Sequence, residues 1–408
     1  MKKKITIIGV NYYPEDTAIG LYTSQLTDYL HTNNYEVSVI TGFPYYPSWK
    51  INKEYRSKKV FLKENINGIT TYRYKQYVPS KPTFFKRILH LLDFTIGSFV
   101  NLFKIKSTDV VLCIVPFTST IFLGILLSKL KRAKLWVHVQ DFEFDAASDS
   151  DLTQKKSKKS LFFKMLFWLE KRLLKSADIR STISSSMLRK LASKSPNLKN
   201  ILLPNWVDVN DINPKQSKTH NYLKSNAFKI LYSGNIGEKQ DWEFFIRFAK
   251  SIEKNSNIEI IIVGDGSKRA WLEKKLLGLN NVMIKPPVPY NELSDLLCST
   301  DLHFLFQKVD VIDTVMPSKI LAMMASQKPS LITGSLNSEV ATIIKNSKAG
   351  AYFYSTDLKK VTSFVATLEK DISLGKQYGL NARNYVSEHF SKEEILKQFK
   401  KTLESLTS

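Results

Sequence analysis

Short runs of apolar residues alternate with amphipathic stretches through most of the chain. In the first half, four runs rich in β-branched residues predict buried strands over Lys4–Gly9, Glu36–Ile40, Asp109–Val115 and Lys134–Val139. The amphipathic stretch Ile19–His31, between the first two runs, predicts a helix. Strands that alternate with helices in this way are typical of a doubly wound parallel sheet.

The same alternation starts again in the second half. Predicted strands cover Lys229–Tyr232, Ile258–Val263, Val282–Ile284 and Leu302–Phe306, and predicted helices cover Trp242–Lys254 and Lys268–Leu277. Between the halves, Pro204–Pro214 (PNWVDVNDINP) is polar and bracketed by prolines, as expected of a hinge. The pattern therefore predicts an α/β protein with two Rossmann-like domains, 1–204 and 205–388, and a C-terminal helix, 389–408, that packs back toward the first domain.

One apolar run has the length of a membrane span. Val110–Leu127 contains no charged residue, but Pro116 interrupts it and Thr118–Thr120 provide a start for a helix. We therefore expect a buried strand followed by a helix rather than a span. The basic N-terminal segment MKKKITIIGV is interpreted as the first strand, because its apolar run is too short for a signal peptide.

The charge of the chain is strongly positive and unevenly distributed. Of its 408 residues, 60 are Lys or Arg and 37 are Asp or Glu, which gives a formal net charge of +23. Residues 1–204 carry 33 basic and 15 acidic side chains, and the remainder carries 27 and 22. The first half is thus expected to face an anionic partner, either nucleic acid or an acidic membrane. No nucleic-acid-binding module is recognisable in the sequence.

Two segments of the basic half suit a membrane surface. Phe84–Phe103 and Lys155–Lys175 each place aromatic and aliphatic residues near one helical face, beside clusters of lysine and arginine. The alternative for each is an ordinary core-facing helix with solvated lysines. Because both segments are aromatic and basic, we expect the protein to be cytoplasmic and attached peripherally to the anionic inner face of the cell membrane. Cys113 and Cys298, without zinc-site or disulfide spacing, fit a reducing compartment.

Glycine-rich turns mark a candidate anion site in the second half. The segment YSGNIGEKQ follows a predicted strand, so Gly234 and Gly237 would let the backbone fold round a phosphate that Lys239 neutralises. Gly264, in VGDG, marks a second close-packed turn. Ser318 and Lys319 open another predicted helix and can address phosphate at its N-terminus. Two lysines at two helix starts indicate a pyrophosphate ligand.

The first half contributes further candidates at strand ends. His138, Gln140 and Asp141 lie at the end of the predicted strand Lys134–Val139, where ligands of such folds bind. Glu143 and Asp145 follow, so a metal site is an alternative, but without a second histidine nearby we expect no metal. After the first strand, the loop NYYPEDTAIG ends in Gly20, which lets backbone N–H groups approach an anion closely.

In this order and spacing, the motifs resemble the GT-B glycosyltransferases of family GT4. The segments NYYPEDTAIGLYT, TGFPYYPSW, HVQDFEFD, PNWVD, YSGNIGEKQ and MPSKI look like those of bacterial fucosyl- and fucosaminyl-type transferases of colanic-acid, O-antigen and capsule assembly. The resemblance covers nearly the whole chain and implies two Rossmann-like domains that face each other across a cleft. It also implies retaining transfer from a UDP- or GDP-sugar to a polyprenyl-diphosphate-linked glycan, without a metal or other cofactor.

By position, the resemblance assigns roles to individual residues. His138 would lie beside the donor sugar, Lys239 would neutralise the pyrophosphate, and Asp141 completes the expected catalytic set. The expected donor-binding residues are Gly20, Gly234, Asn235, Gly237, Lys239, Gly264, Val288, Asp313, Pro317, Ser318 and Lys319.

Two positions depart from the family pattern. Asn235 stands where many members have an arginine, and Leu321 or Ala322 stands where they have a glutamate that accepts from the ribose hydroxyls. Nucleoside recognition is therefore expected to differ, through Asp313 or backbone groups near Val288–Tyr290. A sugar-nucleotide epimerase or phosphorylase on the same fold, or a basic nucleic-acid-binding protein, are the alternative functions.

Overall fold

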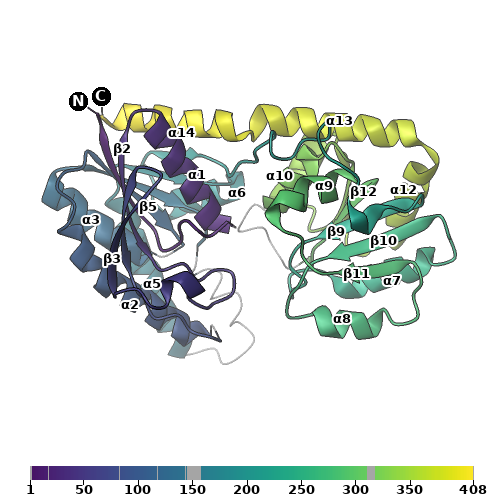
Figure 1. Cartoon of the computed structure of the whole chain (residues 1–408), viewed down its shortest axis with the longest axis horizontal. Helices are drawn as coiled ribbons and strands as arrows, with labels where there is room; N and C mark the ends of the chain where they lie inside the picture. Colours follow the sequence, from purple (N-terminus) through teal and green to yellow (C-terminus); the bar gives the residue numbers. More distant parts are fainter. Residues whose placement is uncertain are drawn as a thin grey trace. The chain divides into compact units, whose positions relative to one another are not determined.

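The computed structural model describes residues 2–16, 18–81, 83–116, 118–142, 144, 158–309 and 318–407. The chain forms two compact units, the first of residues 1–205 with 396–408 and the second of residues 206–395 (Figure 1). Each unit is built on a largely or wholly parallel sheet, which confirms the expected α/β architecture. Residues 389–395, which the sequence pattern assigns to the C-terminal helix, belong to the second unit.

The first unit contains an eight-stranded sheet in the order β3-β4-β2-β1-β5-β6-β7-β8. Only the β3–β4 pair is antiparallel. The strands are β1 Lys4–Ile8, β2 Glu36–Gly42, β3 Phe61–Ile66, β4 Ile69–Tyr74, β5 Val110–Val115, β6 Lys134–Val139, β7 Ile179–Thr182 and β8 Asn200–Leu202. The β3–β4 hairpin was not predicted, although its turn, Asn67-Gly68 with φ of 50° and 87°, is a recognised hairpin signal.

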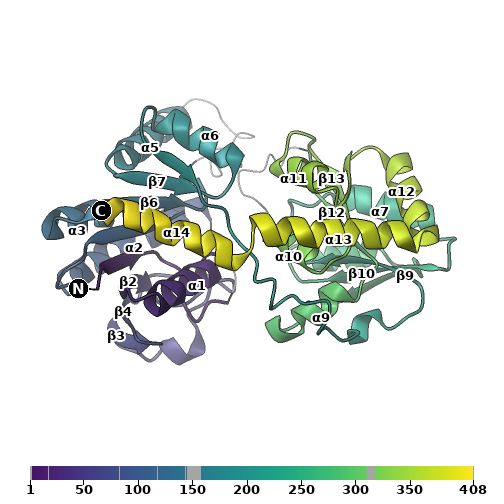
Figure 2. The same cartoon turned by 90° about the horizontal axis from the view of Figure 1, so that it is seen from above.

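Helices cover both faces of this sheet (Figure 2). They are α1 Ala18–Thr32, η1 Lys53–Tyr55, α2 Phe84–Leu102, α3 Ser119–Lys131, α5 Lys158–Lys175, α6 Ser185–Lys194 and α14 Lys392–Thr407. Helix α3 contacts both α2 and α5. Helix α14 packs on the sheet through Phe399, whose ring stacks on Trp136 of β6 at a centroid distance of 5.4 Å.

The apolar run Val110–Leu127 is divided as expected between strand β5 and helix α3. Every residue of β5 is buried. In the part of the chain that the structure describes, no helix combines the length and the apolar character that a membrane span requires.

The second unit contains a wholly parallel sheet in the order β11-β10-β9-β12-β13-β14. Its strands are β9 Phe228–Ser233, β10 Ile258–Val263, β11 Val282–Lys285, β12 Leu302–Phe306, β13 Ser330–Gly334 and β14 Gly350–Tyr354. Its helices are η2 Asn221–Leu223, α7 Trp242–Ile252, α8 Arg269–Lys275, η3 Tyr290–Glu292, α9 Leu293–Cys298, α10 Ser318–Ala325, α11 Glu339–Ser347, α12 Leu358–Lys370 and α13 Ile372–His389. The aromatic rings of Tyr232, Trp242, Phe245 and Phe306 pack against one another, mostly edge to face or tilted, and fill the core beneath the loop that follows β9.

Candidate functional site

Two loops at the carboxyl edge of the second sheet pack backbone against backbone. The loop after β9 is fixed to the loop after β10, because the Gly234 N–H donates to the Val263 carbonyl at 2.8 Å and the Ile236 N–H donates to the Asp265 carbonyl at 2.8 Å. A Cβ atom at Gly264 would lie 1.9 Å from the Gly234 carbonyl oxygen. Glycine at 264 is therefore a steric requirement, as the predicted close-packed turn implies.

Lys319, in the first turn of α10, reaches into this pair of loops. Its Nζ donates to the Tyr232 hydroxyl at 3.3 Å and lies 5.1 Å from the centre of the tyrosine ring. The hydroxyl in turn donates to the Asn235 carbonyl at 2.7 Å. At Gly234, where φ is 140°, a Cβ atom would lie 2.3 Å from the lysine Nζ. The structure thus brings together Lys319, Gly234, Gly264 and the backbone of Asn235.

The ammonium of Lys319 is poorly solvated. Burial lowers its pKa to about 8, and it forms no ion pair with any residue that the structure describes. Burial also raises the pKa of Tyr232, which therefore remains a neutral phenol. A desolvated cation next to glycine backbone at the carboxyl end of parallel strands suits a phosphate group. Tyr232 was not among the predicted site residues, although it begins the glycine-rich segment.

Lys239 is placed differently from the sequence expectation. Its side chain is exposed, while its backbone carbonyl accepts from the Lys308 N–H at 3.1 Å. Helix α7 begins only at Trp242, and its N-terminus is capped by Asp241, whose carboxylate accepts from the Phe244 N–H at 3.0 Å. The N-terminus of α7 is therefore occupied by an acid of the chain itself, and Lys239 is an exposed loop cation rather than part of a helix-terminus site.

The other predicted donor-binding residues vary in their placement. Asn235 is exposed, Gly237 is buried, and Val288 is half-buried in the loop after β11. The Gly237 N–H donates to the Gln240 Oε1 atom at 3.3 Å, within the loop itself. Asp313 and Pro317 lie outside the described residues, as does the side chain of Ser318.

His138 lies in the core of the first unit. It is 1% exposed, and burial lowers its pKa to about 3, so the ring is neutral. Its Nε2 lies 3.0 Å from the Gln140 amide nitrogen, which donates to it, and its Nδ1 donates to the Ser181 hydroxyl at 2.8 Å. Phe399 covers the ring at a centroid distance of 5.1 Å. These contacts are those of a structural histidine, so the expected place beside a donor sugar remains a prediction that this geometry does not favour.

Glu15 is a buried acid that sequence reasoning missed. Its Oε1 accepts from the backbone N–H groups of Tyr45 and Tyr46, each at 2.8 Å, and its Oε2 accepts from the Asn11 amide at 2.8 Å. Desolvation raises its pKa despite these bonds. A Cβ atom at Gly20 would lie 2.7 Å from the Glu15 Cβ, so the glycine makes room for this acid.

Glu15 therefore ties together the loops that follow β1 and β2. Asp141, which follows β6 at the same edge of the sheet, is half-buried. Glu143 and Asp145, the other acids of the alternative metal site, lie outside the described residues.

Comparison with known proteins shows the family to which the chain is similar. The family model described as "Glycosyl transferases group 1" matches residues 227–371. The chain is 33% identical over 410 residues to "Putative colanic acid biosynthesis glycosyl transferase WcaI" of Escherichia coli K12, covering 97% of this chain and 98% of that protein.

Solved structures share the fold at low sequence identity. Sucrose-phosphate synthase from Thermosynechococcus elongatus aligns with a TM-score of 0.72 and 12% identity, covering 99% of both chains. The Anabaena protein Alr3699/HepE in complex with UDP aligns with a TM-score of 0.67 and 12% identity, covering 99% of this chain and all of that one. The chain, with its GT-B fold, belongs to the group 1 glycosyltransferases.

Proposed function

We propose that the protein is a retaining glycosyltransferase of bacterial surface polysaccharide assembly, such as O-antigen or capsule. It moves a sugar of fucose or N-acetylfucosamine type from a UDP- or GDP-sugar to a polyprenyl-diphosphate-linked glycan. Family membership, the colanic-acid role named for the WcaI relative and the UDP bound by HepE support this proposal. The observation that carries it is the Lys319 ammonium held against the Gly234 backbone at the carboxyl edge of the sheet.

The chemistry of the reaction needs such a cation. Cleavage of the bond between sugar and diphosphate develops negative charge on the leaving oxygen, and a fixed cation in a poorly solvated setting stabilises that charge. Tyr232 fixes Lys319 through its hydroxyl and its ring face. In a retaining transfer the leaving phosphate assists the incoming hydroxyl on the same face of the sugar, so no carboxylate nucleophile is needed. We therefore expect turnover without a metal.

Nucleoside recognition follows a different route from that of many family members. Leu321 is fully buried and Ala322 has no polar side-chain atom, so neither side chain accepts from ribose hydroxyls. We assign these contacts to the loop Val288–Tyr290 after β11, whose backbone groups lie near the carboxyl edge of the same sheet. Asp313 is the second candidate from the sequence.

The direct test is turnover with defined donors. Purified protein is incubated with UDP- and GDP-sugars and a polyprenyl-diphosphate-linked glycan, and the released nucleoside diphosphate and the anomeric configuration of the product are measured. The proposal predicts release of one nucleoside diphosphate and retention of configuration. Thermal stabilisation by UDP or GDP identifies the base, since a ligand that binds only the folded state raises stability. Inversion, or no stabilisation by either nucleotide, contradicts the proposal.

Helix α2 supports attachment to a membrane because its apolar face points outward. Phe85 and Ile96 are 78% and 72% exposed, and Phe103, which caps the helix, is 64% exposed. The same exposed stripe includes Leu89, Leu92 and Phe99. The inner face instead buries polar residues, His90, Ser98 and Asn101, beside Phe94 and Leu102. This is the reverse of a core-facing amphipathic helix.

The neighbouring helices extend this surface. Exposed large apolar residues on α3 and α5 are Phe122, Leu130, Leu161, Met165, Trp168 and Leu169. Lys86 and Arg87 on α2, Lys129 on α3 and Lys175 on α5 supply exposed positive charge on the same helices. An apolar surface with a basic rim fits a bilayer of anionic lipids. We propose that this face holds the acceptor-binding unit on the inner leaflet; Lys155 and Lys156 lie outside the described residues.

Co-sedimentation distinguishes a membrane from nucleic acid. Phe85→Ser with Ile96→Ser should strongly reduce binding to vesicles that contain phosphatidylglycerol, and should leave transfer to a short water-soluble acceptor nearly intact. Leu277→Ser, at an 80% exposed leucine of the second unit, is the matched control and should bind vesicles normally. Binding to an oligonucleotide that exceeds binding to vesicles at both low and physiological salt would favour the nucleic-acid alternative.

A further inference from the structure

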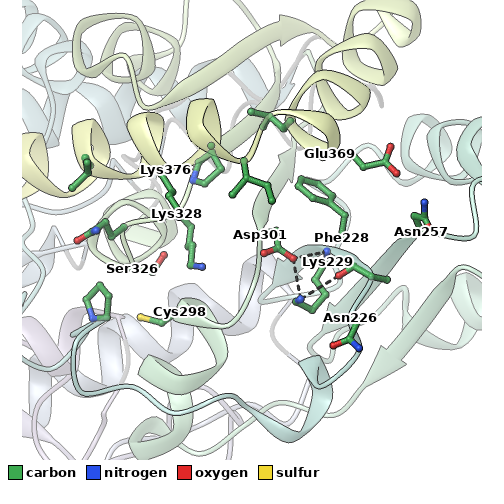
Figure 3. A pocket seen from close by; sticks show the side chains of 18 of the residues that line it. Asn226, Phe228, Lys229, Asn257, Cys298, Asp301, Ser326, Lys328, Glu369 and Lys376 are labelled. Carbon is green, nitrogen blue, oxygen red and sulfur yellow. Dashed lines mark hydrogen bonds and ion pairs between the residues drawn. The ribbon is translucent and has the colours of Figure 1, made fainter.

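The second unit has a large pocket at the edge of its sheet opposite the candidate site. Its volume is about 860 Å³, within the range of small-molecule sites. The residues Lys229, Asp301 and Lys328 line it where strands β9, β12 and β13 begin, and helix α13 forms another wall (Figure 3). Because β9 runs from this pocket to the loop that contains Gly234, a ligand here is separate from one held by Lys319.

The acids of the pocket already have partners. The Asp301 carboxylate accepts from both the Lys229 Nζ at 3.0 Å and the Lys229 backbone N–H at 2.9 Å. The Lys229 ammonium also donates to the Ala227 carbonyl at 3.1 Å. The Glu369 carboxylate accepts from the Asn255 amide at 2.9 Å. Three lysines and two carboxylates line the pocket, which leaves it with a net positive charge.

Two further lysines of the pocket make no direct contact with an acid that the structure describes. Lys328 and Lys376 form no hydrogen bond or ion pair through their ammonium groups with any described residue. Figure 3 labels Lys376, on helix α13, and Lys328 on the same side of the pocket, with Lys328 beside Ser326. Lys328 is half-buried, and desolvation is the main cause that lowers its pKa. Two cations of one pocket, neither in a direct ion pair and one of them partly desolvated, are available to an anionic ligand.

The other residues that line the pocket suit the apolar, organic part of a ligand. Phe228, Leu368, Ile372 and Leu380 supply apolar surface. Between them, Gly375 of α13 faces open space, since a Cβ atom there would meet no atom within 4 Å. The pocket therefore offers an apolar wall beside two lysines.

We propose that this pocket binds the phosphate monoester of a small organic molecule, with the phosphate between Lys328 and Lys376 and the organic part against the apolar wall. A phosphate monoester carries a charge of about −1.5 to −2 at neutral pH, which two ammonium groups match better than a monoanionic carboxylate does. The site is independent of the proposed transfer reaction, because it lies at the opposite edge of the sheet.

The test measures the binding of phenyl phosphate, the probe, to the full chain by isothermal titration calorimetry. Wild type should bind it more tightly than inorganic phosphate, benzoate or phenol. Lys328→Gln and Lys376→Gln should each weaken binding by about 10-fold or more. Gly375→Leu should abolish it, since the leucine side chain would fill the pocket from a helix that accepts leucine well. Lys274→Gln, at an exposed lysine of α8, is the matched control and should not change the affinity.

Competition separates this site from the nucleotide site. An excess of UDP or GDP should leave the affinity for phenyl phosphate unchanged, and the Lys328 variant should keep its thermal stabilisation by the nucleotide. Displacement of the probe by the nucleotide, equal binding by the Gly375 variant, or no binding by the wild type would each overturn the proposal. The protein could also bind the probe through these lysines but bind neither UDP nor GDP. That result would support this site and contradict the proposed nucleotide-sugar donor.

Discussion

Replacing Lys319 by methionine should weaken donor binding without lowering the stability of the protein. Burial lowers the pKa of this lysine from its ordinary value of 10.5 to about 8. With 1.36 kcal/mol for each pKa unit, holding the charged form in the free protein costs up to about 3 kcal/mol at neutral pH. Methionine has a similar shape and no charge, so Lys319→Met should unfold at the same temperature as wild type or a higher one.

The same replacement should nearly abolish donor binding. A diphosphate at Gly234 would lose a charge-assisted contact, which corresponds to a fall in kcat/KM for the donor of about 100-fold or more. The wild-type value should itself decline as the pH rises through about 8, where the free lysine loses its proton. Lys319→Arg retains its charge and should lose this decline.

Thermal unfolding with and without UDP or GDP, together with donor kinetics over pH, measures both effects. Any gain in stability of the methionine variant should be present below pH 8 and disappear toward pH 10.5, because the unfolded lysine keeps its proton over that interval. Lys274→Met is the matched control and should change neither property. A methionine variant that is less stable and still stabilised by the nucleotide would refute the reasoning, because Lys319 would then be a structural residue.

Three further predictions concern turnover and stability. Lys239→Ala should lower donor turnover by about 10- to 1,000-fold without unfolding the protein, if this exposed cation closes on the pyrophosphate; unchanged kinetics would remove it from the site. Turnover should persist in EDTA, and its complete loss, restored by manganese or magnesium, would point to Asp141 and the acids that follow it. Gly264→Ala should lower the free energy of unfolding by about 1–3 kcal/mol and weaken donor binding together, since its Cβ would collide with the Gly234 carbonyl; a variant as stable as wild type would show that the loops can separate.

Central strands could be predicted because burial on both faces produces continuous apolar runs. Strands β1, β5, β6, β9 and β10 all follow this rule and begin and end within two residues of the expected positions. Among the strands that were missed, β3, β8 and β14 lie at sheet edges, where few residues are buried and the apolar pattern is weak. The others, β4, β7 and β13, are internal strands; β7 and β13 are fully buried but only four and five residues long and rich in serine and threonine, so their apolar runs are too short to stand out.

The site was harder to predict, because sequence shows which residues are charged but not what surrounds them. Lys239 and Lys319 both precede predicted helices, yet only Lys319 lies against the backbone of a glycine loop. His138 ends a strand beside acids, but the pleat directs its ring under Phe399. Glu15 could not be identified, since its role depends on two loops, distant in sequence, that meet in space. For α2, periodicity revealed an apolar face but not that this face points away from the core.

The way α14 completes the first unit has a consequence for biosynthesis. Phe399 and Leu403, both 1% exposed, are core residues of the first unit, although the whole second unit is translated before them. At about 5–20 residues per second, the nascent first unit waits roughly 10–40 s with the surface over Trp136 uncovered. During that interval the apolar surface around Trp136 is accessible to chaperones. A protein that loses residues 396–407 should thus have a normally folded second unit and a first unit that is prone to aggregation.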